Sequence, residues 1–328
     1  MLMKILITGA LGFIGSHISE HYLLKGDEVF GVDNQSGKYP ADLYHYNRSL
    51  LVKHKLFSCY SMDIKHRTGL DALIKTVSPN VVVHTAALTG VRDGANHPYQ
   101  YVSNNTLGTQ NLLEACRKKD NIKIILLSSS SVYGDQSQGP FSEQTRLLPK
   151  SIYAISKQAM ESIAEYYSKY YGLNILIVRP FSVYGPRGRM NMLPLILLKS
   201  IAYNQPFYRF GNDKNNKRDW TYVNDFVEAL DRLIQKKSNN FDIINIGSGN
   251  PMGIEQFLVI FKTLSYQILH KRVTEVKIDK PAYEMETTWA DTSKLFRYIG
   301  KTEFTPLNKG VENLLKYYHT RWNTYFPI

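Results

Sequence analysis

Short apolar runs alternate with longer amphipathic stretches along the chain up to about residue 180. The apolar runs predict strands at 4–8, 28–34, 56–62, 80–84, 123–129 and 174–179. The stretches between them have helical periodicity and predict helices at 13–26, 69–78, 105–119 and 151–171. Alternating strands and helices are typical of a doubly wound parallel sheet, so the sequence predicts an α/β fold of the Rossmann type.

The alternation breaks after about residue 182, where Pro- and Gly-rich segments begin. A helix is expected near 192–203, followed by shorter α and β fragments. We therefore expect a first domain over 1–182, to which part of 222–250 returns, and a smaller C-terminal α/β lobe that comprises mainly 183–328. No internal repeat or low-complexity linker separates the two.

A glycine-rich turn joins the first predicted strand to the first predicted helix. ILITGALGFIGSH places Gly9, Gly12 and Gly15 where a backbone must turn tightly and approach a diphosphate at a helix N-terminus. The spacing is GxxGxxG and not the commoner GxGxxG. Asp33 ends the next strand, where a carboxylate accepts from ribose hydroxyls and repels a 2′-phosphate, so NAD is favoured over NADP. Asp63 and Ile64, at another strand end, either grip an adenine ring or form an ordinary strand exit.

A serine, a tyrosine and a lysine form a candidate catalytic set. Tyr153 and Lys157 are four residues apart on a predicted helix and therefore share a face. A phenol has an ordinary pKa near 10 and is a poor base at neutral pH, and a nearby cation lowers that pKa. Ser129, at the end of a predicted strand, is the natural hydroxyl to position a substrate alcohol.

Composition and charge narrow the class of protein. No apolar run reaches the roughly 20 residues of a membrane span, and two cysteines, Cys59 and Cys116, make neither a disulfide framework nor a usual zinc site. We expect a soluble cytoplasmic protein with no metal and no membrane partner. The formal net charge is +12, but the basic residues are scattered, so an anionic small substrate explains the charge at least as well as nucleic acid.

Taken together, these motifs resemble the extended short-chain dehydrogenase/reductases, and among them the nucleotide-sugar epimerases and dehydratases. The resemblance runs through TGALGFIG, VDN, HTAA, NNTLGT, SSSSVYG, YAISK, RPFSVYGP, KRDWTYVNDFVEA and WADTSK. It implies a tightly held NAD, a homodimer formed through the helices near 105–119 and 151–171, and a C-terminal lobe that binds a nucleotide sugar. The cofactor residues it implies, with those above, are Gly9, Gly12, Phe13, Ile14, Gly15, Asp33, Asn34, Asp63, Ile64, Ala86, Ala87, Asn105, Tyr153, Lys157 and Pro180.

The residues that follow Ser129 discriminate between reactions in this family. Similar 4,6-dehydratases carry Asp-Glu there, because elimination of water needs an acid and a base, and the similar decarboxylases keep a Glu. This chain has Ser130 and Ser131. The remaining Ser, Tyr and Lys suffice for inversion at C4 through a 4-keto sugar.

Two segments, AALTGVRDGANHP and VYGPRGRMNM, most resemble those of UDP-glucuronate 4-epimerases, which read AGVR and YGPxGRPDM. This resemblance implies that one arginine faces the diphosphate and that Arg189 supports the pocket for the sugar carboxylate. The expected substrate residues are Arg92, Ser130, Ser131, Ser182, Arg187, Arg189 and Arg218. Met190-Asn191 departs from the usual Pro-Asp, and near the C-terminal end Lys280 is the nearest cation where the family often has Arg.

Alternatives remain open from the sequence. The leading hypothesis is conversion of UDP-glucuronate to UDP-galacturonate for surface polysaccharide. The same framework also suits a UDP-glucose or UDP-GlcNAc 4-epimerase, another dehydratase, or a reductase. A silent NAD-binding scaffold or a nucleic-acid binder is the alternative from another class, and the intact Ser129, Tyr153 and Lys157 argue against silence.

Overall fold

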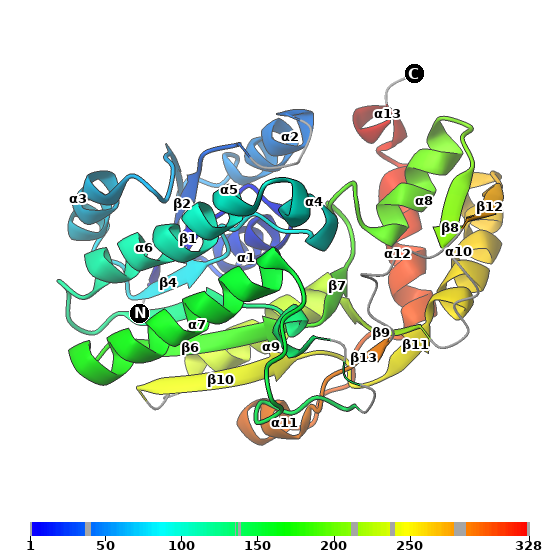
Figure 1. Ribbon diagram of the computed structural model, residues 1–328. Coiled ribbons are helices and arrows are strands. Elements are labelled where there is room, and N and C mark those ends of the chain that lie inside the picture. Colours follow the sequence, from blue (N-terminus) through cyan, green and yellow to red (C-terminus); the bar gives the residue numbers. More distant parts are fainter. Residues whose placement is uncertain are drawn as a thin grey trace.

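A seven-stranded parallel sheet forms the centre of the protein (Figure 1). The computed structural model describes residues 2–36, 41–134, 136, 139–210, 216–236, 240–278 and 287–326. The strand order is β10-β6-β5-β4-β1-β2-β3. The strands are β1 (Lys4–Thr8), β2 (Glu28–Asp33), β3 (Phe57–Ser61), β4 (Val81–His84), β5 (Lys123–Leu127), β6 (Asn174–Pro180) and β10 (Phe241–Ile246). The predicted α/β fold with a doubly wound parallel sheet is confirmed.

Helices cover both faces of this sheet because its central strands are buried on both sides, as their near-continuous apolar sequences indicate. One face packs against α1 (Phe13–Leu24), α2 (Ala41–Leu51), α9 (Val223–Gln235) and α11 (Ser293–Ile299). The other packs against α3 (Arg67–Val77), α6 (Gly108–Cys116) and α7 (Ile152–Tyr171). Helix α2 lies in a segment for which the sequence suggested no element.

The helix expected over 105–119 is shorter and differently wound. The chain passes through α4 (Val91–Asn96), α5 (Pro98–Val102) and a π-helical turn at Ser103–Leu107 before α6 begins at Gly108. A 3₁₀ turn at Ser130–Tyr133 follows β5. Both turns lie next to the carboxyl ends of the strands, which is where parallel sheets bind ligands.

A second body with its own core lies beyond these strand ends (Figure 1). Its strands are β7 (Ser182–Tyr184), β8 (Phe207–Phe210), β9 (Lys217–Tyr222), β11 (Pro251–Gly253), β12 (Glu275–Ile278) and β13 (Thr287–Thr288). Its helices are α8 (Leu193–Ala202), α10 (Ile254–Leu269), α12 (Leu307–His319) and α13 (Trp322–Tyr325). Between β9 and β11 the chain returns to the main sheet as α9 and β10, and β10 pairs with β6 over six residues. No helix in the described ranges is long and apolar enough to cross a membrane.

Candidate active site

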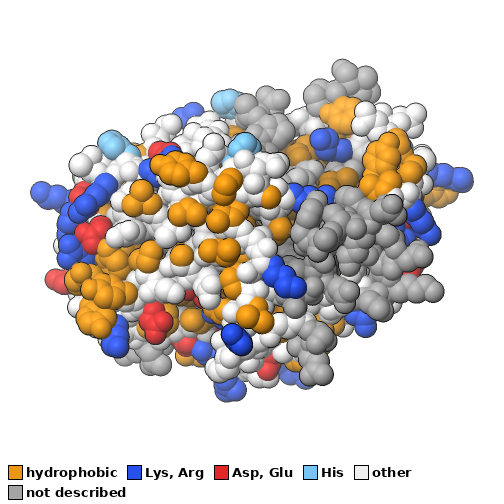
Figure 2. Space-filling model, in the orientation of Figure 1, with side chains coloured by type: hydrophobic (Ala, Val, Ile, Leu, Met, Phe, Trp, Pro, Cys, Tyr) orange, Lys and Arg blue, Asp and Glu red, His pale blue; other side chains and the backbone are white. Residues whose placement is uncertain are grey.

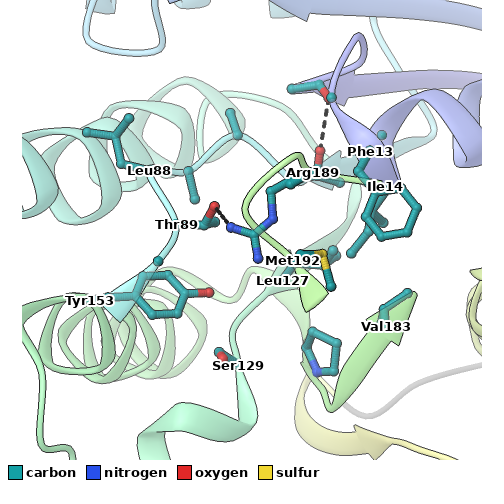
Figure 3. Close-up of a pocket in the computed structure, with 18 of the residues that line it drawn as sticks. Phe13, Ile14, Leu88, Thr89, Leu127, Ser129, Tyr153, Val183, Arg189 and Met192 are labelled. Carbon is teal, nitrogen blue, oxygen red and sulfur yellow. Dashed lines mark hydrogen bonds between the residues drawn. The ribbon is translucent and has the colours of Figure 1, made fainter. Parts of the chain in front are cut away.

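A cavity of about 550 Å³ opens between the carboxyl ends of the sheet strands and the second body (Figure 3). Most residues predicted from the sequence line it. They are Gly9, Gly12, Phe13, Ile14, Gly15, Asp33, Asn34, Ile64, Ala86, Ala87, Ser129, Ser130, Ser131, Tyr153, Lys157, Pro180, Ser182, Arg189 and Arg218. Asp63, Arg92, Asn105 and Arg187 do not line the cavity.

The glycine-rich turn is shaped for a group that must lie against backbone. Gly9 has a φ of +70°, and a Cβ at Gly15 would lie 2.1 Å from the Gly9 carbonyl oxygen. Helix α1 follows Gly12 with no side-chain cap and no acidic residue in its first turn. The first amides of a helix have no intrahelical acceptor, so a diphosphate fits here and receives both their hydrogen bonds and the helix dipole.

One carboxylate, that of Asp33 at the end of β2, lines the cavity. The carboxylate of Asp33 accepts from the amides of Leu11 at 3.0 Å and Gln35 at 2.8 Å, and its burial raises its pKa. Asn34 lines the cavity and donates to Asp63 at 3.0 Å. Of the two residues considered for adenine, Ile64 therefore faces the cavity, while Asp63 lies behind Asn34.

Strand β5 and helix α7 together position the Ser-Tyr-Lys set. Helix α7 begins after Ser151, whose side chain accepts from the Ala154 amide at 3.2 Å. Lys157 is buried and donates to the Leu127 carbonyl at 2.6 Å, which ties α7 to the end of β5. Ser129 follows that strand end, and Figure 3 shows the hydroxyl of Tyr153 directed toward it.

The pKa values of this set depend on burial more than on neighbouring charges. Burial raises the pKa of Tyr153, while a hydrogen bond with Ser129 and the charge of Arg189 oppose that shift. Burial lowers the pKa of Lys157 to about 8, and Glu161 opposes this. The sequence suggested Lys157 as the cation that lowers the pKa of Tyr153. In the structure the charge that lowers the pKa of Tyr153 is that of Arg189, and the increase caused by burial is larger.

Arg189 points into the cavity and contacts Thr89, which Tyr101 in turn holds, and the sequence singled out neither Thr89 nor Tyr101. Its Nη1 donates to the Thr89 hydroxyl (Figure 3). Tyr101 donates to the Thr89 carbonyl at 2.8 Å and to Asp93 at 2.9 Å, and its ring meets that of Tyr153 edge-on at 6.3 Å. Thr89 and Tyr101 carry no motif signal of their own, because their role depends on tertiary contact.

The structure does not bring Arg187 or Arg92 to the cavity. Nη2 of Arg187 lies 2.5 Å from Oε2 of Glu20 on α1, and the arginine side chain is 4% exposed. Arg92 is exposed in the first turn of α4. Neither residue is therefore retained as a substrate contact. The expected contacts near Lys280 lie outside the described residues.

On the other side of the cavity, Arg218 and Trp220 come from β9 and flank one buried carboxylate. Asp219 accepts from the amides of Ser248 at 2.7 Å, Gly249 at 3.0 Å and Ala290 at 3.1 Å. A fully buried carboxylate is stable when backbone donors satisfy it. Asp219 thereby fixes two distant segments, at residues 248–249 and at Ala290, against the strand that carries Arg218.

Asn105 and His84 support the site from behind. Asn105 donates to the Leu88 carbonyl at 2.9 Å and to Ser156 at 3.0 Å, so it orients the cavity wall and α7 without facing the cavity. His84 lies between the hydroxyls of Thr8, at 2.7 Å, and Thr109, at 2.9 Å. Burial and Lys157 lower its pKa to about 3, so it is neutral. Its role is therefore structural.

The cavity accommodates a dinucleotide at the α1 end and places a serine, a tyrosine and a lysine at the other, which is the arrangement of a dehydrogenase-like enzyme. The chain belongs to the NAD dependent epimerase/dehydratase family, whose sequence model matches residues 5–247. Its cofactor is NAD, and the glycine cradle and uncapped helix described above fit that group.

Individual relatives resemble the chain over nearly its whole length. It is 34% identical to a UDP-glucuronate 4-epimerase of Thermodesulfobacterium geofontis, over 95% of both chains. It is 35% identical to an uncharacterized UDP-glucose epimerase, YtcB, of Bacillus subtilis, over 96% of this chain and 98% of the relative. The crystal structure of UDP-glucuronic acid 4-epimerase from Bacillus cereus, with UDP-glucuronic acid and NAD, matches with a TM-score of 0.89 at 34% identity, covering 98% of this chain and all of that one.

Proposed function

We propose that this protein is an NAD-dependent UDP-glucuronate 4-epimerase that forms UDP-galacturonate. One observation carries the proposal: three neutral serines, Ser130, Ser131 and Ser182, line the cavity together with Ser129 and Tyr153. Among the described residues that line the cavity, the cations are Lys157, Arg189 and Arg218, and the single acid, Asp33, is at the cofactor end. A doubly anionic diphosphate with a further carboxylate suits that distribution.

In the mechanism that follows, Tyr153 takes the proton of the sugar C4 hydroxyl and later returns it. Ser129 accepts from or donates to the same oxygen and holds it in line with the phenol. NAD supplies the hydride acceptor at C4 and the donor that reduces the 4-keto sugar on its other face. Arg189 is the cation that lowers the pKa of Tyr153 in the resting site, and we assign to charged Lys157 a further stabilisation of the phenolate that forms when Tyr153 has lost its proton.

The serines have a second task in this proposal. The 4-keto form of a uronate is a β-keto acid, which loses CO₂ readily. Ser130, Ser131 and Ser182 donate hydrogen bonds to the carboxylate, and Arg189 supports that pocket. A carboxylate that is hydrogen-bonded and fixed in this way should lose CO₂ less readily. Glu in place of Ser130 should therefore release more CO₂, and no increase would argue against this role.

The deciding experiment incubates the purified protein with NAD⁺ and, separately, UDP-glucuronate, UDP-glucose and UDP-N-acetylglucosamine, with NMR detection of the product sugar. Formation of UDP-galacturonate from the first alone supports the proposal. In Tyr153→Phe, turnover should be lost while the cofactor is kept, whereas Tyr208→Phe, at an exposed tyrosine of β8, should match the unchanged protein. Turnover by Tyr153→Phe would show that the base is misassigned.

A neutral-sugar epimerase is the second candidate, because the similar B. subtilis relative is described as a UDP-glucose epimerase. The same residues would catalyse that reaction, and the contacts to C6 would differ, as would those to C2 for an N-acetylated sugar. Conversion of UDP-glucose or UDP-N-acetylglucosamine, with UDP-glucuronate inert, would favour this candidate and remove the carboxylate role of the serines.

The assembly is also a proposal. Figure 2 shows hydrophobic side chains spread over the face formed by α5, α6 and α7. They include Tyr99, Val102, Leu107, Ile155, Tyr166, Tyr170 and Tyr171, all exposed in the monomer. An apolar face of this kind marks an interaction site, and we assign it to a homodimer, testable by light scattering. We also propose that the protein is a cytoplasmic enzyme of polysaccharide synthesis. In this proposal residues 1–182 and part of 222–250 form the NAD-binding domain, and residues 183–328 form mainly the substrate lobe.

A further inference from the structure

Arg187 and Arg189 lie two residues apart and point in opposite directions. Arg189 enters the cavity and donates to Thr89 (Figure 3). Arg187 leaves it and pairs with Glu20 on α1, with 2.5 Å between Nη2 and Oε2. The same short segment, residues 186–192, therefore contacts the substrate end of the cavity with one arginine and the cofactor helix with the other. We call this segment the arginine loop.

The helix that receives Arg187 is the one that presents backbone amides to the cofactor. Its first turn, at Phe13 and Ile14, lines the cavity, and Glu20 lies about two turns further along. A helix moves as a rigid rod, so a contact at Glu20 relates the position of the arginine loop to the position of the amides at Gly12–Ile14.

The backbone conformation and the burial of Arg187 are both unfavourable in themselves. Its φ is +59°, a left-handed conformation that non-glycine residues rarely adopt. Its side chain is 4% exposed, and its Nη1 has no hydrogen-bond partner among the described residues. Its charge, together with burial, also lowers the pKa of the buried His17. Unfavourable local features persist where the surrounding structure imposes them, and they often mark functional sites.

We propose that the Arg187–Glu20 pair is a clamp that positions Arg189 and couples NAD occupancy to the affinity for the sugar nucleotide. When the cofactor orders the first turn of α1, the clamp orders the arginine loop, and Arg189 is then placed beside Tyr153 for the incoming anion. Arg187 is a positioning residue, because it touches neither cavity nor reacting atoms. The substrate part of this inference rests on the function proposed above.

Hydrogen exchange measured without any sugar nucleotide tests the coupling directly. The protein is stripped of cofactor and reloaded with NAD⁺, and amide protection is compared in residues 13–24 and 185–193. In the unchanged protein both segments should gain protection. In Arg187→Met and Glu20→Gln, residues 13–24 should still gain protection and residues 185–193 should not. Protection of the loop in both variants, or its absence in the unchanged protein, would overturn the proposal.

Kinetics with UDP-glucuronate tests the positioning. Each single variant should raise KM about 10-fold, as expected for a lost coupling between charged partners, while kcat and the affinity for UDP alone change less than about two-fold. The double variant should be no worse than either single one, because both remove one contact. An equal loss in UDP affinity would indicate general damage and overturn the positioning role.

Two further variants separate the loss of the clamp from misfolding and from the general loss of a surface charge. Glu20 is 37% exposed, so Glu20→Gln tests the clamp even if Arg187→Met fails to fold. Glu228→Gln removes an exposed ion pair with Arg232 on the neighbouring helix α9 and should change neither measurement. If loop protection follows the clamp but UDP-glucuronate is not converted, the proposed substrate is wrong and the clamp stands. If UDP-glucuronate is converted without coupling, the clamp is wrong.

Discussion

The substitution Gly15→Ala sets two local effects against each other at the cofactor turn. In a helix interior Ala is favoured over Gly by about 1 kcal/mol. At Gly15, however, the added Cβ would lie 2.1 Å from the Gly9 carbonyl oxygen and 2.8 Å from the carbon of that carbonyl. The obstacle is backbone, so α1 must move by about 1 Å to reach an ordinary contact. Overpacking of this kind costs about 1–3 kcal/mol, and more where nothing yields.

We therefore expect Gly15→Ala to lower the free energy of unfolding of the cofactor-free protein by about 1–2 kcal/mol. We also expect NAD⁺ affinity to fall about 100-fold, since a displacement near 1 Å has effects of that size on positioned groups. Urea unfolding monitored by circular dichroism gives the first quantity. Titration calorimetry with NAD⁺ gives the second.

A matched glycine separates the clash from the residue type. Gly69 is also helical, in α3, and its added Cβ would meet the far ends of the His66 and Met62 side chains, which can move. Gly69→Ala should be neutral or stabilising by up to about 1 kcal/mol and should leave NAD⁺ affinity unchanged. If Gly15→Ala behaves like Gly69→Ala, the close approach of α1 to the turn does not govern cofactor binding.

Three further outcomes follow from the site. The pKa of Lys157 is about 8, and Glu161 raises it. Because Lys157 loses its charge above that pH, kcat/KM should fall above about pH 8. Glu161→Gln should move this alkaline limb to lower pH, whereas Glu165→Gln, at an exposed residue, should leave it in place. The same shift means that the native state binds fewer protons than the unfolded state between about pH 8 and the ordinary lysine pKa, so the stability contribution of Lys157 should rise with pH across that window. Arg189→Ala should impair turnover of UDP-glucuronate more than that of a neutral UDP-sugar, and equal losses on both would remove Arg189 from carboxylate recognition.

The sequence predicted most of the sheet because its strands and helices obey simple periodicities. The turn at Gly9 to Gly15 and the pair Tyr153 and Lys157 were recognisable, since their chemistry depends on short spacings along the chain. These local patterns reach the same cavity because parallel strands all present their carboxyl ends on one side.

Long-range contacts account for what the sequence could not predict. Arg187 and Arg189 belong to one motif, but their side chains have different partners, and the backbone at Arg187 is left-handed. Thr89 holds Arg189 and Tyr101 holds Thr89, through contacts that no periodicity encodes. The pKa of Tyr153 depends on its burial in the cavity, which outweighs the neighbouring charge considered from sequence.

The late arrival of β10 at the main sheet has a consequence for the nascent chain. Until residues 241–246 have been synthesised, β6 is an open edge with hydrogen-bonding groups facing solvent. Open, apolar edge strands recruit other chains and aggregate. A gene truncated after residue 182 would preserve that hazard permanently, so the cofactor half should be obtained in usable form only when the return through α9 and β10 is kept with it.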